Sequence, residues 1–213
     1  MNKRLIVIGD SITKGTYTQD GDSSPNSVVE INFSTLIKCA LGYTELINHG
    51  INGTAISSTS KIRSELAICI RAKEMQDADT VIVAGGTNDY GNNVVLGSIQ
   101  DKEDISFYGA LEVLCRTLKQ KYKRVYFITP IRREKDGKNG AGYSLEEYRR
   151  AIELKAKEYN FVVIDGYGVP IYPKTEEHRK KYMYDGLHPN AEGHKLYADY
   201  IIERIKDYEN GNI

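Results

Sequence analysis

Four short segments, far apart in the chain, carry residues that together could hydrolyse an ester. Ser11 follows an apolar run near the N-terminus, and Asp185 and His188 stand three positions apart near the C-terminus. Two segments rich in glycine and asparagine, 48–53 and 85–89, lie between them. A hydroxyl nucleophile, a histidine base, an orienting carboxylate and neutral N–H donors are the groups that acyl transfer through a serine intermediate requires.

The Asp-x-x-His spacing of Asp185 and His188 suits a catalytic base with its orienting acid. A loop of this length can fold so that the carboxylate reaches imidazole Nδ1, which leaves Nε2 free to take the proton of Ser11. A turn position for Asp185 and a surface position for His188 are the ordinary structural alternatives. Because Ser11 and this loop are both present, we interpret all three residues as catalytic, and we expect activity to fall at acid pH when the base is protonated.

Gly53 and Asn88 are the candidate donors for an oxyanion hole, together with the backbone N–H of Ser11. A glycine after a strand lets a backbone N–H approach a substrate closely. The side-chain amide of Asn88 is a neutral donor suited to a developing oxyanion. The alternatives are a turn at Asn52-Gly53 and an Asx-turn at Asn88.

Three more side chains beside these segments are candidate substrate contacts, namely Asp10, Tyr90 and Arg132. We also expect Asp10 and Asp89 to hold loops in place by accepting bonds from backbone N–H groups. Arg132 and Arg133 follow a predicted strand, where they either bind an anionic group of a substrate or are solvated.

The elements that must position these residues alternate between strand and helix. Apolar runs typical of strands buried on both faces occur at 5–8, 44–47, 80–84, 124–129 and 161–165. Apolar residues at helical spacing occur at 29–41, 61–73, 106–122, 144–159 and from 190 to about 208. This alternation predicts a five-stranded parallel sheet with helices on both faces, in a flavodoxin-like order with the first strand central.

Long polar loops are predicted at 13–27, 92–105, 132–143 and 166–184. Most of them follow a strand, so they should gather at the carboxyl edge of the sheet, where open α/β sheets bind ligands. The candidate catalytic segments meet at this same edge.

Composition limits the classes of function. The chain has 213 residues, which suits one domain over 1–213. Lys and Arg number 29, as do Asp and Glu, and this balance argues against nucleic acid as a partner. No apolar run approaches the roughly 20 residues of a membrane span. The apolar run at 5–8 is too short for a signal peptide and lacks a cleavage site, so a cytoplasmic location is expected. Neither the three cysteines nor the four histidines have metal-ligand spacing.

At this point the chain resembles the SGNH hydrolases, also called the GDSL esterase/lipase family, which contribute Ser, Gly, Asn and His from four sequence blocks. The four blocks here read Gly9-Asp10-Ser11-Ile12, Asn48-x-Gly50-x-Asn52-Gly53, Gly86-Thr87-Asn88-Asp89 and Asp185-Gly186-Leu187-His188. The first differs from the family pattern by Ile12 in place of leucine. In the second, Gly53 is favoured as the family glycine, with Gly50 as the other reading.

The resemblance implies a flavodoxin-like three-layer α/β/α sandwich that hydrolyses esters or thioesters without a metal or other cofactor. It implies Ser11, Asp185 and His188 as the catalytic residues, and Ser11, Gly53 and Asn88 as the oxyanion hole.

The choice of substrate depends on the composition of the edge loops. The chain has no Trp, only 4 Phe and 16 Tyr. Many of the tyrosines fall in or beside the predicted edge loops: Tyr17, Tyr90, Tyr108, Tyr143, Tyr167, Tyr172, Tyr182 and Tyr184. Tyrosine suits a sugar ring better than an acyl tunnel. The sequence therefore predicts a serine esterase for short acyl groups on an oligosaccharide or another small polar molecule. A lysophospholipase or acyl-CoA thioesterase with the same residues, and a non-catalytic ligand-binding module, are the alternatives.

Overall fold

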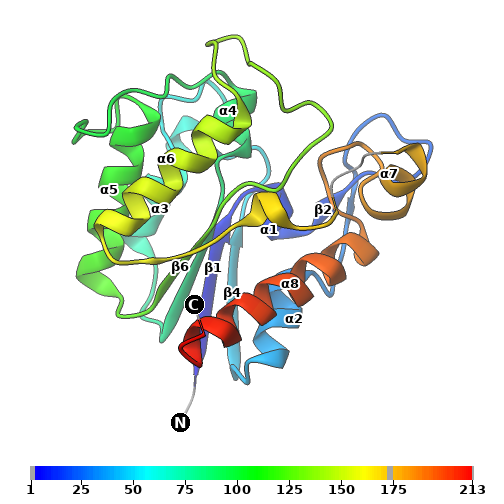
Figure 1. The fold of residues 1–213 in the computed structure, drawn as a ribbon, viewed down its shortest axis with the longest axis horizontal. Coiled ribbons are helices and arrows are strands. Elements are labelled where there is room, and N and C mark those ends of the chain that lie inside the picture. The colour runs from blue at the N-terminus through cyan, green and yellow to red at the C-terminus, as the bar shows by residue number, and fades with distance from the viewer. Residues whose placement is uncertain (1–2, 172–174, 213) are drawn as a thin grey trace.

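The fold is a five-stranded parallel sheet between two layers of helices (Figure 1). The computed structural model describes residues 3–171 and 175–212. The sheet strands are β1 (Arg4–Gly9), β4 (Glu45–Gly50), β5 (Thr80–Ala84), β6 (Val125–Ile128) and β7 (Val162–Ile164). They confirm the predicted three-layer α/β/α class, and each lies within a few residues of a predicted strand.

The strand order is β4-β1-β5-β6-β7, so β1 is an interior strand but not the middle one. Counted along the sheet, the strands are in the order 2-1-3-4-5, which confirms the predicted flavodoxin-like order. The first strand lies inside the sheet as expected, although β5 is the middle strand. The chain reverses its direction across the sheet at β1, which pairs with β4 on one side and β5 on the other. Such a reversal is where ligands bind in open α/β sheets.

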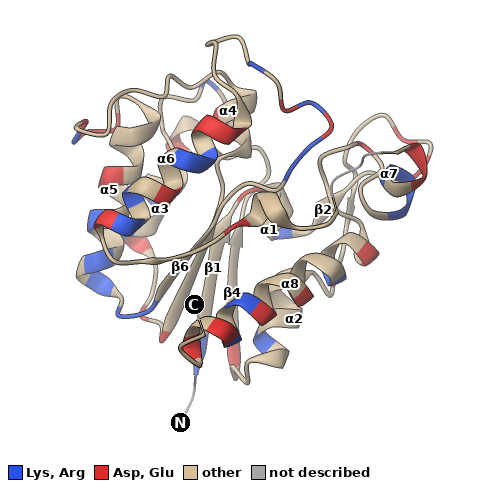
Figure 2. Cartoon of the chain, viewed as in Figure 1, with Lys and Arg blue, Asp and Glu red and all other residues tan. Residues whose placement is uncertain are grey.

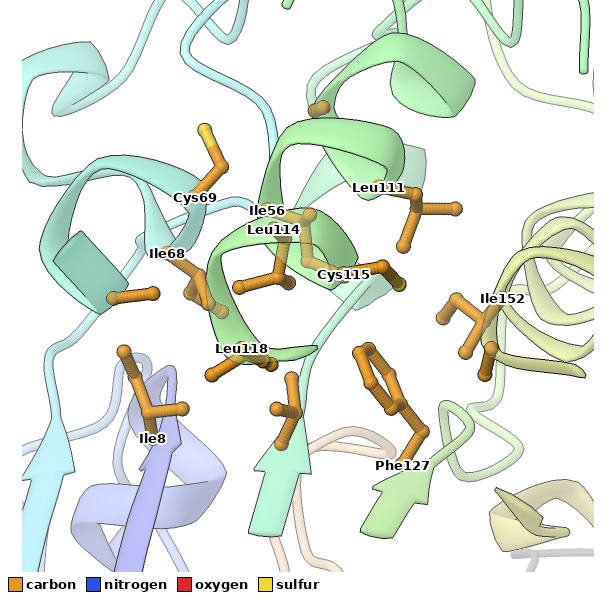
Figure 3. Packing of buried hydrophobic residues seen from close by; sticks show 14 of the residues in the cluster. Ile8, Ile56, Ile68, Cys69, Leu111, Leu114, Cys115, Leu118, Phe127 and Ile152 are labelled. Carbon is orange, nitrogen blue, oxygen red and sulfur yellow. The ribbon is translucent and has the colours of Figure 1, made fainter. Parts of the chain in front are cut away.

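Alternate residues of each strand supply the cores on the two faces of the sheet. Ile6 and Ile8 face the layer of α3 (Ile68–Arg71), α5 (Phe107–Lys121) and α6 (Leu145–Glu158), and Figure 3 shows this packing. Leu5 and Val7 face the layer of α2 (Phe33–Ala40) and α8 (Ala191–Glu209). The continuous apolar runs of β1, β5 and β6 have this cause, since these interior strands are buried on both faces.

The long helices begin at side chains that accept bonds from otherwise unpaired N–H groups. Ser106 accepts from the Gly109 N–H ahead of α5, and Asn190 accepts from the Gly193 N–H ahead of α8. Ser144 and Glu147 form a reciprocal capping box at the start of α6.

The predicted helix over 61–73 is broken into three short pieces. They are the 3-10 turn η1 (Ser64–Leu66), α3 and the 3-10 turn η2 (Ala72–Glu74). Ala67 has an extended ψ of 146° between the first two, which interrupts helical hydrogen bonding although the apolar spacing continues.

The predicted loops contain further short elements. The 13–27 region starts in α1 (Ser11–Lys14) and holds β2 (Thr16–Tyr17), which pairs antiparallel with β3 (Ser27–Val28). Helices α4 (Thr87–Gly91) and α7 (Glu176–Tyr182) and the turn η3 (Gly166–Gly168) complete the fold. Among the described helices, none is long and apolar enough to span a membrane.

Candidate active site

Ser11 begins the short helix α1 directly beyond the end of β1. A Cβ on Gly9 would lie 2.1 Å from Thr13 Oγ1 and 2.3 Å from the carbonyl oxygen of Ala84, so only glycine fits at this turn. Asp10 caps the helix by accepting a 2.9 Å hydrogen bond from the Ile12 N–H. This geometry holds the Ser11 side chain, which is 7% exposed, at the carboxyl edge of the sheet.

The structure brings Ser11, His188 and Asp185 into one hydrogen-bonded chain, although 177 positions separate the serine from the histidine. Ser11 Oγ lies 2.9 Å from His188 Nε2, and His188 Nδ1 lies 2.7 Å from Asp185 Oδ2. Both distances are those of good hydrogen bonds. A serine, a base and a carboxylate in this order can transfer the serine proton to the imidazole and stabilise the imidazolium that forms.

Within the described residues, Asp185 accepts four hydrogen bonds. Oδ1 accepts from the backbone N–H groups of Leu187 and His188, at 2.9 and 2.7 Å, while Thr18 Oγ1 donates to Oδ2 at 2.6 Å, beside the bond from the imidazole. Burial by itself raises the pKa of Asp185, but the bonds from His188 and Thr18 outweigh it and hold this pKa well below its ordinary value. The carboxylate therefore stays ionised and fixes the orientation of the imidazole.

Gly50 and Gly53, the two readings of the second block, have different environments. Gly50 ends β4, where a Cβ would lie 2.2 Å from the Lys14 backbone nitrogen, and its N–H donates to Asn48 Oδ1 at 2.8 Å. Gly53 lies in the following loop with φ of +73°, a conformation that favours glycine. Within the described residues the Gly53 N–H has no acceptor, which leaves it available to a substrate. The contacts thus favour Gly53 over Gly50 as a donor.

Asn88 lies in the first turn of α4 and is partly exposed between buried neighbours. Its side-chain amide donates to the carbonyl of Thr54 at 3.0 Å, which ties it to the loop that carries Gly53. A primary amide has two N–H groups, so this bond leaves one for a substrate. Since β4 and β5 flank β1 in register, the donors of Ser11, Gly53 and Asn88 follow three adjacent strands at one edge.

Two buried carboxylates lie beneath the site, and both hold backbone as expected. Asp89 accepts from the N–H groups of Ile56 and Ser57 at 2.8 and 2.9 Å, while Asp10 caps α1. Burial raises the pKa of Asp89 to about 7 and that of Asp10 to about 6, although the backbone hydrogen bonds oppose the shift.

The three candidate substrate contacts are placed differently from what the sequence predicts. Asp10 is only 2% exposed, and Tyr90 is 7% exposed with its hydroxyl donating to the carbonyls of Lys135 and Gly137. The Arg132 guanidinium stacks 4.5 Å from the centre of the Tyr167 ring. Asp10 and Tyr90 thus hold backbone, and Arg132 packs against an aromatic side chain.

Arg133, rather than Arg132, lies beside the catalytic candidates. A cleft of about 290 Å³ is lined by Pro25, Arg133, Glu134, Lys135, Asp185, Gly186, Leu187 and His188. Figure 2 shows charges of both signs along the loop after β6 that forms one side of this cleft. Sequence alone could not separate the two neighbouring arginines, because only the path of that loop decides which of them faces the site.

The tyrosines that the sequence predicts as contacts for a sugar ring do not line this cleft among the described residues. Its lining within the described residues contains no tyrosine, and Tyr172 lies outside those residues. Tyr90 and Tyr143 instead pack edge-on against the buried Tyr148. Their apolar rings are used in the core, so the count of tyrosines says little about the substrate.

Arg71 is a residue that the sequence did not single out. Its guanidinium donates to the carbonyls of His49 and Gly9 at 2.7 and 2.9 Å, and to Thr54 Oγ1 at 3.2 Å. It therefore joins the ends of β4 and β1 to the Gly53 loop. An arginine in an amphipathic segment is ordinarily solvated, and no local pattern marks this one.

Side chains that could hold a metal are a separate question. Nowhere in 3–171 or 175–212 do three or more His, Cys, Asp or Glu side chains gather in a group that could bind a metal ion.

Comparison with known proteins supports the same reading. Residues 7–196 match the GDSL-like Lipase/Acylhydrolase family. No curated protein matches the chain. Among solved structures, a protein from Lactobacillus plantarum is 27% identical, with a TM-score of 0.83 and 97% of each chain covered.

Two more distant structures share the fold. An aryl esterase from M. smegmatis is 15% identical, with a TM-score of 0.69 over 96% of this chain and 99% of that one. An acetylxylan esterase from Geobacillus stearothermophilus is 20% identical, with a TM-score of 0.63 over 95% of this chain and 94% of that one. The family match covers most of the chain and confirms the resemblance seen in its four blocks. The chain belongs to the GDSL-like Lipase/Acylhydrolase family and is an ester-hydrolysing enzyme.

Proposed function

We propose that this enzyme hydrolyses short-chain carboxylic esters, acetyl esters above all, carried by a carbohydrate or another polar alcohol. A single catalytic domain over 1–213 performs the reaction through an acyl-enzyme on Ser11. The observation that carries the proposal is the continuous chain from Ser11 Oγ to His188 and Asp185, with distances of 2.9 and 2.7 Å.

The reaction follows from the roles of these groups. Ser11 Oγ attacks the ester carbonyl while His188 Nε2 takes its proton, and the imidazolium is stabilised by Asp185. The oxyanion of the tetrahedral intermediate accepts from the Ser11 and Gly53 N–H groups and the Asn88 amide. His188 then gives its proton to the leaving alkoxide, which departs as the alcohol. Water, activated by His188 in the same way, hydrolyses the acyl-serine and regenerates the enzyme.

The preference for a short acyl group rests on the surroundings of the site. Most residues that line the cleft beside His188 are charged or polar, and among the described residues Pro25 and Leu187 are its larger apolar side chains. On the other side, the half-exposed Ile62 lies near Gly53, with its Cγ2 3.8 Å from where a Cβ would stand. Each buried methylene stabilises binding by about 0.8 kcal/mol, so a long chain needs far more apolar lining than this.

Covalent labelling tests the nucleophile. We expect a fluorophosphonate to label one residue, Ser11, when the adduct is mapped by mass spectrometry, and prior treatment with EDTA to leave labelling and activity unchanged. Labelling at another serine would overturn the assignment.

A series of p-nitrophenyl esters from acetate to octanoate tests the acyl group. We expect kcat/KM to be greatest for acetate or propionate. An optimum at eight carbons would instead favour a lysophospholipase or thioesterase, while leaving the catalytic residues as assigned.

A further inference from the structure

We propose that Arg133 forms a subsite for an anionic group on the alcohol half of the substrate, so that the preferred ester is an acylated sugar acid or sugar phosphate. The inference rests on the proposed function above and names its substrate class more closely. Its basis is the guanidinium of Arg133, which is half-buried and lies beside His188. This guanidinium forms no ion pair with any described carboxylate, whereas His188 pairs with Asp185.

Arg133 is held in place by weak contacts. Its Nη1 lies 3.5 Å from the Thr87 carbonyl oxygen and 3.4 Å from Thr87 Oγ1, at the long limit for hydrogen bonds. The guanidinium also lies over the ring of Tyr90, 5.4 Å from its centre. Burial lowers the pKa of Arg133, which reflects the cost of holding this charge away from water. These contacts orient the guanidinium but leave most of its five donors unused.

The acidic groups of the cleft are already matched. Glu134 pairs with Arg179 at 3.1 Å. Asp185 is bound by His188, Thr18 and two backbone N–H groups. Lys135, also in the lining, is exposed. Arg133 therefore has no direct ion-pair partner among these carboxylates, and the charges of Asp185 and Asp136 act on it only at longer range. An anion bound directly to a partly buried guanidinium of this kind stabilises it further.

The position of the cleft says which half of the substrate carries the anion. His188 must deliver its proton to the leaving oxygen, so the alcohol lies on the side of the imidazole. The cleft shared by His188 and Arg133 is on that side, and its volume of about 290 Å³ is near the lower end for small-molecule sites. It suits one sugar-sized unit. A guanidinium binds carboxylate or phosphate through two parallel hydrogen bonds, which is the chemistry that both anions share.

Three acetylated sugars separate the sources of the anion: O-acetyl glucuronate, O-acetyl glucose 6-phosphate and the neutral O-acetyl glucose. We expect kcat/KM for at least one anionic sugar to exceed that for the neutral one by about 10- to 100-fold. The carboxylate and phosphate arms show which anion fits. Arg133→Gln should bring that ratio close to one, and Arg133→Lys should restore part of it. Arg116→Gln, which removes an exposed arginine of α5, should keep the wild-type ratio.

Equal rates on all three sugars would overturn the inference, as would an Arg116→Gln variant that loses the ratio as fully as Arg133→Gln. Absence of activity on every short ester, the neutral sugar included, would instead reject the proposed function. In that event, calorimetric titration of Ser11→Ala with the same sugars still decides the subsite: tighter binding of an anionic sugar supports it, and equal binding rejects it. Thermal unfolding of each variant confirms that it is folded.

Discussion

Among the polar networks of the described residues, one lies between α5 and α6 and another at the carboxyl edge of the sheet. Between the helices, Lys155 Nζ donates to Glu112 at 2.9 Å and to Glu158 at 2.7 Å. The Tyr159 hydroxyl donates to the other Glu112 oxygen at 2.8 Å. The Lys155 side chain is 1% exposed and that of Glu112 is 7% exposed, and both charges are met within the network.

The network at the sheet edge joins groups of the same kinds but ends differently. It starts at Asp185, whose oxygens are all engaged, and runs through His188 to Ser11 Oγ. Among the described residues, His188 is the only hydrogen-bond partner of that hydroxyl. The network therefore ends at an atom that can still react, whereas the interhelical one closes on itself. Burial and charge alone do not distinguish an active site from a structural ion pair. The difference is that one network ends at a hydroxyl that can still contact a substrate.

Removal of the Ser11 hydroxyl is expected to give the largest effect on the rate of ester hydrolysis. In Ser11→Ala, kcat should fall by roughly four to six orders of magnitude, because the nucleophile is lost. The thermal midpoint should stay within a few degrees of wild type, since the hydroxyl has a single partner. Stopped assays with a short ester and a melting curve measure the two quantities. Retained turnover would contradict the role of Ser11.

Disruption of the network between α5 and α6 is expected to have the opposite outcome, a loss of stability without a loss of rate. Lys155→Met leaves Glu112 buried beside an apolar side chain, so the free energy of unfolding should fall by about 3–5 kcal/mol while kcat stays unchanged. Lys157→Met, at an exposed position of the same helix, is the matched control. Urea unfolding that gives the same stability for both variants would show that the interhelical pair is not needed for folding.

Asn88 tests whether the sheet-edge network works with neutral donors. Asn88→Ala should lower kcat by about 10²–10³-fold with little change in KM, because the bond matters most once negative charge has developed. Asn92→Ala is the matched control, since the Asn92 amide also anchors the same loop, through Ser60 Oγ at 3.0 Å. An equal loss of kcat in Asn92→Ala would reduce Asn88 to a loop anchor.

Much of this arrangement could be predicted from local sequence. Ser11 follows a strand whose apolar run is unmistakable, and Asp185 and His188 are close enough in sequence for one loop to join them. The relative order of β4, β1 and β5 then brings the blocks together. The residue types after the neighbouring strands indicated Gly53 and Asn88 as candidate donors, and the resemblance to a family with four ordered blocks implied the same roles.

What could not be predicted depends on contacts between distant residues. The three carbonyl and hydroxyl acceptors of Arg71 at the strand ends lie between 17 and 62 positions away. The choice between Arg132 and Arg133 depends on the path of one loop. The prediction that edge-loop tyrosines contact a sugar failed for Tyr90 for a related reason. Residue type indicates an amphipathic ring, but only packing decides whether the Tyr90 ring contacts a ligand or Tyr148.

The carboxylates of Asp10 and Asp89 differ from both networks, because they are buried against N–H groups without a matched charge. Their pKa values, raised to about 6 and about 7 by burial, mean that the folded protein binds protons that the unfolded chain releases above about pH 4. This contribution to stability is complete below about pH 4 and is lost as the pH rises through 6 and 7. The lowered pKa of Asp185 acts below this window. Burial lowers the pKa of His194 to about 3, so the contribution of His194 to stability rises with pH up to about 6.5 and partly offsets that loss.

We therefore expect the two carboxyl groups to lower the unfolding free energy by roughly 2–4 kcal/mol between pH 5 and pH 8, with His194 offsetting part of this fall below about pH 6.5. Urea unfolding at several pH values measures the slope, and Asp89→Asn should reduce it because that position no longer titrates. An unchanged slope in Asp89→Asn would show that Asp89 is ionised in the folded protein at all these pH values.

Substitution of Arg71 is expected to have the smallest effect on kcat. It tests how far catalysis depends on the residues that hold the Gly53 loop in place. Arg71 is a positioning residue that ties Gly9, His49 and Thr54 together, so Arg71→Met should shift the Gly53 N–H slightly and lower kcat about tenfold, close to 1.4 kcal/mol, at nearly constant KM. Arg71→Lys should recover only part, since an ammonium cannot reproduce the fork of a guanidinium. Because Arg71 and Asn88 both act on the Thr54 loop, combining Arg71→Met with Asn88→Ala should cost less than the two separate losses added together. Additive losses in kcat would show that Arg71 acts independently of Asn88, and a loss of stability with kcat unchanged would assign Arg71 to folding alone.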